Sequence, residues 1–296
     1  MNFQIGIDGG GSKTEFILVA PGGAIVARHL APGCNPSSTD QDTVRSLLAA
    51  GLRGMVAAAP APVSATLLCM AGSRVFWRAY AAALPAECGR GLAVDDSLPV
   101  LELATGGAPG LVLHAGTGSF VAARGPDGAT HYAGGLGWRF GDAGSGHDLG
   151  RRAVARALLE LQGWETETPL ATLLRDHTAQ PDAAGASRFF YAEANAATAK
   201  VAALAPAVLR LATEGDPTAR QLVLDSAGEL HALALKVAAK IFPSTPLATL
   251  RCGLSGPLLT NPLVRDALAA RSPLPLAPVE GSPIEGVRRM LARGCV

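Results

Sequence analysis

The sequence has little net charge and no long apolar run, and each absence excludes a class of protein. Its formal charge at pH 7 is +1 over 296 residues, so we expect no nucleic-acid partner and no attraction to an anionic membrane. Proline, glycine or charged residues interrupt the apolar stretches before they reach the length of a bilayer, so no membrane span is expected. A strand pattern that begins at Phe3 leaves no room for a signal peptide. We therefore expect a cytoplasmic protein.

Cysteine is also scarce. The five cysteines are Cys34, Cys69, Cys88, Cys252 and Cys295, and none belongs to a Cys-x-x-Cys pair. Their odd number and their spacing argue against a disulfide framework, a zinc site or an iron–sulfur cluster. What the chain does have is 49% hydrophobic and 17% charged residues. That composition fills a substantial core, in one large or two ordinary domains.

A glycine-rich turn, Asp8 to Thr14, lies between two apolar segments near the start of the chain. Apolar residues alternate from Phe3 to Ile7, and Phe16 to Val19 has the composition of a second strand. The glycines therefore fall at the tip of a β-hairpin, where successive N–H groups form an anion site. An acid at the end of the incoming strand suits Mg²⁺. The turn predicts a nucleotide triphosphate site, and a glycine-rich hairpin without a ligand is the alternative.

Neither common phosphate-binding motif fits this turn. A P-loop needs four residues between its first glycine and Gly-Lys-Ser/Thr, followed by a helix. Here Ser12 separates Gly11 from Lys13, and a strand follows. The dinucleotide fingerprint also requires a helix after its glycines. The turn therefore belongs to another class of phosphate site.

The rest of the chain alternates strand and helix signals and then repeats its opening. The spacing of apolar residues predicts helices over 40–58 and 75–84. Apolar runs predict strands at 65–70 and 92–94, and this alternation indicates an α/β fold. After a break at 106–110, a strand, the turn Gly116 to Ser119 and another strand repeat the first hairpin. We expect a duplicated domain with a central cleft. We also expect mainly helices over 148–241, a strand at 247–250 and a last helix at 284–293.

Together these motifs resemble the N-acetylglucosamine kinase and BadF/BadG/BcrA/BcrD group of the actin-like and hexokinase-like ATPases. The residues that carry the resemblance are Asp8 to Thr14, Asn35, Asp95-Asp96, Gly116 to Ser119, Gly134 to Trp138, Gly141 to Gly146 and Gly253 to Gly256. The resemblance spans nearly the whole chain. It implies two ribonuclease-H-like domains, over 1–107 and 108–283, with the helix 284–293 packed back on the first. It also implies ATP and Mg²⁺ as cofactors, a sugar substrate and, by analogy alone, a homodimer.

The resemblance implies ATP contacts in three segments. They comprise Gly9, Gly10, Gly11, Ser12, Lys13 and Thr14 in the first phosphate loop, Gly116, Thr117 and Gly118 in the second, and Gly253, Ser255 and Gly256 near the adenosine. Asp8 would orient Mg²⁺, through water. For Gly253 to Gly256, an ordinary turn between a strand and a helix is the alternative.

For the general base, the resemblance favours Asp96, which would take the proton of a sugar hydroxyl as it attacks the γ-phosphate. The adjacent Asp95 is the competing assignment, because strand side chains alternate between faces and only one of the two should point into the cleft. Both acids serving only to cap the next helix is the other alternative.

The sugar contacts implied by the resemblance are Asn35, Asp96, Ser119, Gly135, Leu136, Gly137 and Asp142. The alternatives are a loop turn for Asn35 and a helix cap for Asp142. Trp138 stacks on the sugar or belongs to the core. The family usually has Glu or Gln after the Asp of Gly-Asp-x-Gly-Ser, whereas this chain has Ala143. That departure leaves open N-acetylglucosamine, glucosamine or a muramic acid derivative.

Two further functions stay open at the level of the sequence. One is an ATPase activator of a dehydratase or reductase, which would need a cysteine-bound cluster. The other is a sugar sensor or assembly protein without catalysis. An ATP-dependent amino sugar kinase acting at the 6-hydroxyl is the leading hypothesis, because Asp8, Asp96 and both phosphate loops are present.

Overall fold

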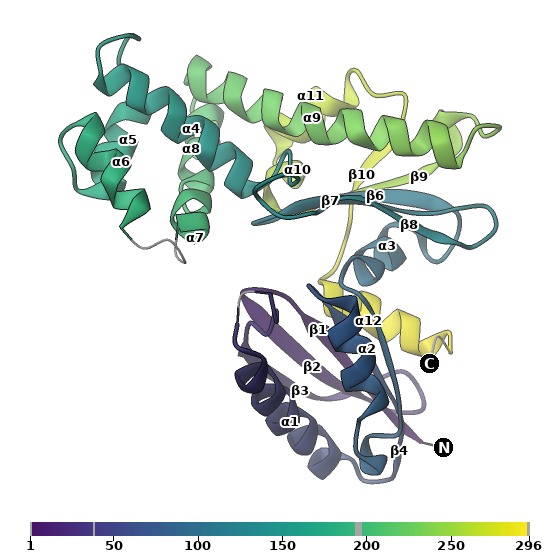
Figure 1. The fold of residues 1–296 in the computed structure, drawn as a ribbon. Coiled ribbons are helices and arrows are strands. Elements are labelled where there is room, and N and C mark those ends of the chain that lie inside the picture. The colour runs from purple at the N-terminus through teal and green to yellow at the C-terminus, as the bar shows by residue number, and fades with distance from the viewer. Residues whose placement is uncertain (1, 38, 193–196, 295–296) are drawn as a thin grey trace. The chain divides into compact units, whose positions relative to one another are not determined.

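The computed structural model describes residues 2–37, 39–192 and 197–294. The chain divides into two compact units, Met1–Gly107 with Glu280–Val296 and Ala108–Val279. Each unit has a five-stranded mixed sheet with helices packed against it (Figure 1). The predicted α/β class is therefore confirmed.

The first unit is built on the predicted N-terminal hairpin. Its strands are β1 (Phe3–Gly9), β2 (Lys13–Val19), β3 (Ile25–Pro32), β4 (Val63–Met70) and β5 (Arg90–Asp95). They lie in the order β3-β2-β1-β4-β5. The pairs β1–β2 and β2–β3 are antiparallel, whereas β4 runs parallel to β1 and β5 parallel to β4. Gly9 pairs with Thr14 across the tip of the hairpin.

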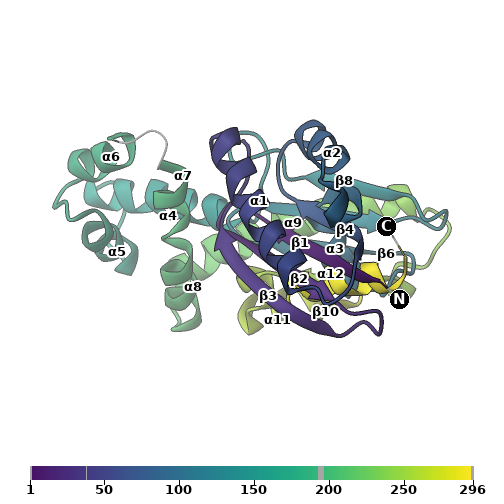
Figure 2. The same ribbon diagram turned by 90° about the horizontal axis from the view of Figure 1, so that it is seen from below.

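Helices cover both faces of this sheet, so its central strands bury side chains on both faces. The helices are α1 (Gln41–Ala58), α2 (Arg74–Ala82), η1 (Ala86–Cys88), α3 (Ser97–Thr105) and α12 (Pro283–Ala292). On β4, Leu68 joins the core beneath α1 and α2, and the neighbouring Leu67 joins the core beneath α12. Successive strand residues point to opposite faces. The last helix of the chain thus packs on β1 and α3 of the first unit (Figure 2).

The second unit repeats the topology of the first. Its strands are β6 (Gly110–Ala115), β7 (Ser119–Arg124), β8 (Thr130–Gly134), β9 (Arg251–Ser255) and β10 (Leu276–Pro278). The order β8-β7-β6-β9-β10 matches that of the first sheet strand for strand. Again the first three strands form an antiparallel meander, and the last two run parallel. This repetition confirms the predicted duplication of a ribonuclease-H-like fold.

Most of the second unit is helical, as expected over 148–241. Its helices are α4 (Gly146–Leu161), α5 (Pro169–Thr178), α6 (Ala183–Tyr191), α7 (Ala197–Ala202), α8 (Ala205–Thr213), α9 (Pro217–Ile241), α10 (Pro257–Thr260) and α11 (Pro262–Ala269). The long α9 lies along β6 and β7 with Ala227, Ala234 and Ala238 buried. The helices α5 and α6 lie at the far end of α4 from the sheet (Figure 1). The beginning of α4 lies near the strands, where the N–H of Gly146 donates to the carbonyl of Gly116.

The strand expected at 247–250 is wrong. Pro246 opens a 3₁₀ turn, η2 (Leu247–Thr249), in which the N–H of Thr249 donates to the carbonyl of Pro246 at 2.9 Å. Pairing with β6 begins only at Arg251. Gly253 and Ser255 therefore lie inside β9, and only Gly256 belongs to the turn that follows.

The search for a membrane span and the state of the cysteines concern the described residues alone. None of their helices is long and apolar enough to cross a membrane. Cys34, Cys69, Cys88 and Cys252 are buried thiols, and Cys295 lies outside the described residues.

Candidate functional site

In the first unit, the segment that follows β3 contacts the tip of the first hairpin through its backbone. The N–H of Gly10 donates to the carbonyl of Lys13 at 3.0 Å, and the N–H of Cys34 donates to the carbonyl of Gly10 at 3.1 Å. A Cβ on Gly33 would lie only 2.1 Å from the carbonyl oxygen of Gly11, so the two segments touch through backbone. The turn is therefore closed by its own backbone and tied to the segment at Cys34.

The hydroxyl of Thr14 adds a second tie between the loop and this segment. Its Oγ1 donates to the carbonyl of Pro32 at 2.9 Å and lies 3.0 Å from the Sγ of Cys34. Thr14 is fully buried, which places it beneath the loop. The exposed Lys13 has its ammonium 3.7 Å from a carboxylate oxygen of Glu15. Thr14 therefore supports the loop, whereas Gly11 and Ser12 form its exposed tip.

Asp8 is the penultimate residue of β1 and is mostly buried. Burial, and after it the negative charge of Asp96, raise the pKa of its carboxyl to about 7. The nearby ammonium of Lys13 opposes this shift. Strands β1 and β5 both run parallel to β4, so their carboxyl ends meet at the same edge of the sheet. Asp8 and Asp96 thus form an acidic pair at that edge.

Asp95 and Asp96 have different surroundings although they are adjacent. The carboxylate of Asp95 accepts a bidentate pair of hydrogen bonds from Arg74, with the Nε contact at 2.7 Å. Asp96 stands at the position before α3, yet its side chain makes no capping hydrogen bond. Burial, and after it the charge of Asp95, raise the pKa of Asp96 to about 6, against the opposing effect of the N–H groups of Asp96 and Ser97. Capping therefore does not account for either acid.

Asn35 lies against the loop that follows β4. Its Oδ1 accepts a hydrogen bond from the N–H of Ser37 at 2.9 Å, which is the loop turn considered above as the alternative. A Cβ on Gly72 would lie 2.3 Å from the same Oδ1. Gly72 comes two residues after β4, so Asn35 reaches the sheet edge where β1 and β5 also end. Asn35 therefore forms the loop turn and also lies at this edge of the sheet.

In the second unit, the second hairpin is bound to the start of α4. The N–H of Gly116 donates to the carbonyl of Gly118 at 2.9 Å and closes the turn. The carbonyls of Gly116 and Thr117 accept from the N–H groups of Gly146 and His147, at 2.8 and 3.2 Å. These bonds use N–H groups that a helix start would otherwise leave without partners. The loop and the helix therefore form one rigid piece.

Asp142 lies against the same hairpin in a strained conformation, with φ at 61°. Its Oδ2 would be 3.0 Å from a Cβ on Gly118. Burial raises the pKa of its carboxyl, and the N–H groups of Gly137 and Ser119 oppose that shift. Ser145 caps α4 by accepting from the N–H of Asp148 at 3.0 Å, so the helix-cap interpretation of Asp142 is wrong.

Ser119 ties the hairpin to the loop that carries Asp142. Its buried hydroxyl donates to the carbonyl of Ala143 at 2.6 Å. The side chain of Ser119 is thus committed to a backbone contact beside Asp142. The loop 135–141 carries exposed apolar side chains, with Leu136 at 79% and Phe140 at 91% exposure. Trp138 is 44% exposed and lies 5.3 Å from the ring of His147, so its assignment to the core is wrong.

The turn after β9 lies beside the base of the second hairpin. Gly256 has φ at 91°, and a Cβ there would lie 2.1 Å from the carbonyl oxygen of Ala115. Only glycine fits that position. The hydroxyl of Ser255 lies 3.1 Å from the Nδ1 of His114. Sequence reasoning found neither the contact of His114 with Ser255 nor that of Arg74 with Asp95, because the partners lie far apart along the chain.

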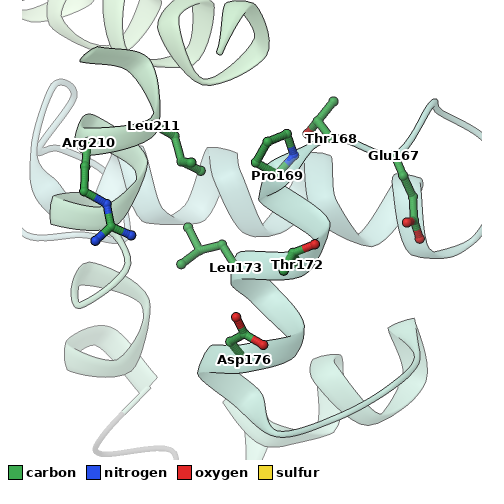
Figure 3. Close-up of a pocket in the computed structure, with 8 residues that line it drawn as sticks. All are labelled: Glu167, Thr168, Pro169, Thr172, Leu173, Asp176, Arg210 and Leu211. Atoms are coloured by element: carbon green, nitrogen blue, oxygen red, sulfur yellow. The ribbon is translucent and has the colours of Figure 1, made fainter. Parts of the chain in front are cut away.

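A pocket of about 470 Å³ lies elsewhere in the second unit, between α5 and α8 (Figure 3). Its lining residues are Glu167, Thr168, Pro169, Thr172, Leu173, Asp176, Arg210 and Leu211. None of the residues predicted for the site is among them. The pocket is therefore separate from the phosphate loops.

Known proteins are similar to this chain in sequence and in fold. The chain is 24% identical to an N-acetyl-D-glucosamine kinase of Dictyostelium discoideum over 253 residues, 80% of this chain and 79% of the relative. It is 25% identical to an N-acetylmuramic acid/N-acetylglucosamine kinase of Clostridium acetobutylicum over 249 residues, 81% and 80% of the two chains. A solved structure from Chromobacterium violaceum, described as a candidate N-acetylglucosamine kinase, matches with a TM-score of 0.78 and 26% identity and covers 98% of this chain and 99% of its own.

The family model for the BadF/BadG/BcrA/BcrD ATPases matches residues 5–268, which is most of the chain. The matched range includes the turns of both hairpins, Asp95 and Asp96, and the loop of Asp142. The chain belongs to the BadF/BadG/BcrA/BcrD ATPase family.

Proposed function

We propose that the protein is an ATP-dependent kinase that phosphorylates an amino sugar, N-acetylglucosamine or glucosamine, at its 6-hydroxyl. The observation that carries this proposal is the state of Asp96, a mostly buried carboxyl with no capping role and a pKa raised to about 6. A general base works best when its pKa is near the working pH. The names of the two curated relatives support the sugar class.

In the proposed reaction, Asp96 accepts the proton of the sugar hydroxyl. The sugar oxygen bonds to the γ-phosphorus while the bond from that phosphorus to the bridging oxygen breaks, and ADP leaves. Such a transfer needs positioning and charge stabilisation more than covalent chemistry. The N–H groups of the two hairpin turns, around Gly11 and Gly118, supply both. Asp95 takes no part because Arg74 holds its carboxylate.

Asp8 fits a magnesium site that has few protein ligands. Its carboxyl is mostly buried with a pKa raised to about 7, so a cation that displaced the proton would neutralise a charge that Lys13 compensates only in part. Among the described residues no three His, Cys, Asp or Glu side chains gather to hold a metal. Phosphate oxygens and water would complete the shell, as is usual for Mg²⁺. The ion would offset the charge of the phosphates.

Asn35 and Asp142 are the proposed sugar contacts of the two units. The Oδ1 of Asn35 reaches the edge where β1, β4 and β5 end, and the carboxylate of Asp142 lies beside the second hairpin. Ala143 has only a methyl group where the family usually has Glu or Gln, so one polar contact near the proposed sugar is missing. That difference is why the proposal names both N-acetylglucosamine and glucosamine.

A panel of sugars tests the function directly. ADP release is measured with ATP and Mg²⁺ in the presence of glucosamine, N-acetylglucosamine, N-acetylmuramic acid, N-acetylmannosamine and glucose. We expect stimulation by one of the first two and none by its 6-deoxy analogue. If no hexosamine stimulates ADP release, the substrate class is wrong. Sugar-independent ATP hydrolysis by an iron-containing protein would instead favour the activator of a dehydratase.

A further inference from the structure

His114 occupies an unusual place in the sheet of the second unit. It lies on the central strand β6 and pairs with Ser255 on the neighbouring parallel strand β9. Its Nδ1 is 3.1 Å from the Ser255 Oγ, which joins the two strands through their side chains. Its ring stacks on that of Phe120 on β7, with centroids 4.9 Å apart and planes 20° apart. One imidazole thus contacts both neighbours of β6.

Each partner of this hydrogen bond stands at the base of a loop. His114 comes two residues before Gly116, and its Nε2 would be 3.1 Å from a Cβ on Gly116, so the ring forms the floor of the second phosphate loop. Ser255 directly precedes Gly256, the glycine that packs on the backbone of Ala115. The loop and the turn are therefore joined below by one side-chain contact.

Packing alone does not explain a histidine here. Burial lowers the pKa of His114 to about 4, so the ring is neutral at physiological pH and has one donor and one acceptor nitrogen. Burying such a polar ring costs free energy unless it is hydrogen-bonded. On the same face of β6, two residues earlier, Val112 is fully buried as an apolar residue. An apolar ring at position 114 would fill the space without that cost.

We propose that His114 is a positioning residue that fixes the second phosphate loop to the turn after β9 and thereby sets the affinity for the nucleotide. The inference rests on the proposed function, because it takes Gly116 to Gly118 and Ser255-Gly256 as nucleotide contacts. His114 acts through these two segments. It touches neither the sugar nor the reacting phosphate.

Two variants at position 114 separate the hydrogen bond from the ring. His114→Phe keeps a planar ring over Phe120 but cannot bond to Ser255. His114→Asn loses the ring but places an amide near the position of Nδ1. Val112→Ala is the matched control, because it removes buried volume from the same strand and face without touching either loop. Each protein is measured for ATP affinity by calorimetry, for kcat, for the KM values of ATP and sugar, and for Tm.

We expect His114→Phe to weaken ATP binding about tenfold, since the loop and the turn are then no longer held together in the free protein and ordering them takes up part of the binding free energy. The kcat at saturating ATP and the KM for sugar should stay within about twofold of wild type. His114→Asn should recover most of the affinity. Ser255→Ala should weaken ATP binding similarly, and the double variant His114→Phe/Ser255→Ala should lose little more than either single variant.

Two results would overturn the inference. In one, His114→Phe lowers Tm but binds ATP like wild type, so the histidine only packs. In the other, Val112→Ala weakens ATP binding as much as His114→Phe does. If His114→Phe does not fold, Ser255→Ala and His114→Asn provide the same comparison. A wild-type protein that binds no ATP overturns the proposed function as well, whereas normal wild-type binding confines the failure to His114.

Discussion

Arg74 holds Asp95 and leaves the adjacent Asp96 to its buried surroundings. The guanidinium at the start of α2 bonds to both carboxylate oxygens at the end of β5, with the Nε contact at 2.7 Å. A bidentate pair of this kind fixes the orientation of the carboxylate. The charge of Asp95 raises the pKa of Asp96. The two neighbouring acids thus differ, because Asp95 is held by Arg74 and Asp96 is mostly buried.

Replacing Asp96 should abolish catalysis without preventing ATP binding. Asp96→Asn keeps the shape of the side chain but cannot accept the hydroxyl proton, so we expect kcat to fall about 10²–10⁴-fold. Asp95→Asn is the matched control and should keep kcat within about tenfold, because its loss acts on Asp96 only indirectly. Steady-state rates and calorimetric ATP affinities check both. A fully active Asp96→Asn protein would remove Asp96 from the mechanism.

The pH profile should report Asp96. A base must be deprotonated to act, and the pKa of Asp96 is raised to about 6. With saturating Mg²⁺, we expect kcat/KM to fall with unit slope as the pH drops below about 6 and to be level above about 7. Asp95→Asn removes a negative neighbour, so its acidic limb should move to lower pH. A profile that stays flat down to pH 5 in wild type contradicts the assignment.

The hairpins and the principal helices could be predicted from local patterns. Alternation and glycine marked β1, β2, β6 and β7, and Asp40 marked the start of α1, where it accepts from the N–H of Thr43. Strands β8 and β10 were missed because β8 has mainly exposed side chains at its start and β10 has only three residues. Their place in the sheet comes from tertiary pairing, which local pattern does not encode.

The sequence predicts site residues that a local pattern marks. It does not predict contacts between residues that are distant along the chain. Asp8 and Asp96 are recognisable because each ends or directly follows an apolar strand. The contacts of Arg74 with Asp95 and of His114 with Ser255 span 21 and 141 residues. They depend on which strands are neighbours and in what register. A residue pattern without that register cannot choose between Asp95 and Asp96.

The negative charge of Asp8 should destabilise the metal-free protein at neutral pH. Its pKa is about 7 in the folded protein, against 3.8 when unperturbed. Between these values the folded state binds the proton more tightly, so the stability due to this group is present below about pH 4 and is lost as the pH rises through 7. Without Mg²⁺ or nucleotide, Asp8→Asn should raise Tm by about 5 °C at pH 8 and leave it nearly unchanged at pH 4. Thermal unfolding at both values checks this. An equal change at both would show that the charge is not the cause.

Replacing Asp142 should weaken sugar binding alone. Asp142→Asn keeps an oxygen for the N–H groups of Gly137 and Ser119 but loses the charge that a sugar hydroxyl would donate to. We expect the KM for sugar to rise about tenfold while ATP affinity is unchanged. Asp127→Asn is the control, because Asp127 lies in the exposed turn between β7 and β8 of the same unit and accepts from the N–H of Ala129. Equal effects of both variants would show a general loss of structure.

A single methyl group at Gly33 should displace the first phosphate loop. A Cβ there would lie 2.1 Å from the carbonyl oxygen and 2.4 Å from the carbonyl carbon of Gly11, and backbone cannot yield as a flexible side chain does. The tip of the loop must therefore move, and because phosphoryl transfer depends on position, we expect Gly33→Ala to lower kcat/KM for ATP about a hundredfold. Gly22→Ala is the matched control, since a Cβ on Gly22 meets nothing within 4 Å. Steady-state kinetics and Tm compare the two variants. Normal kinetics of Gly33→Ala would show that this loop does not position the phosphates.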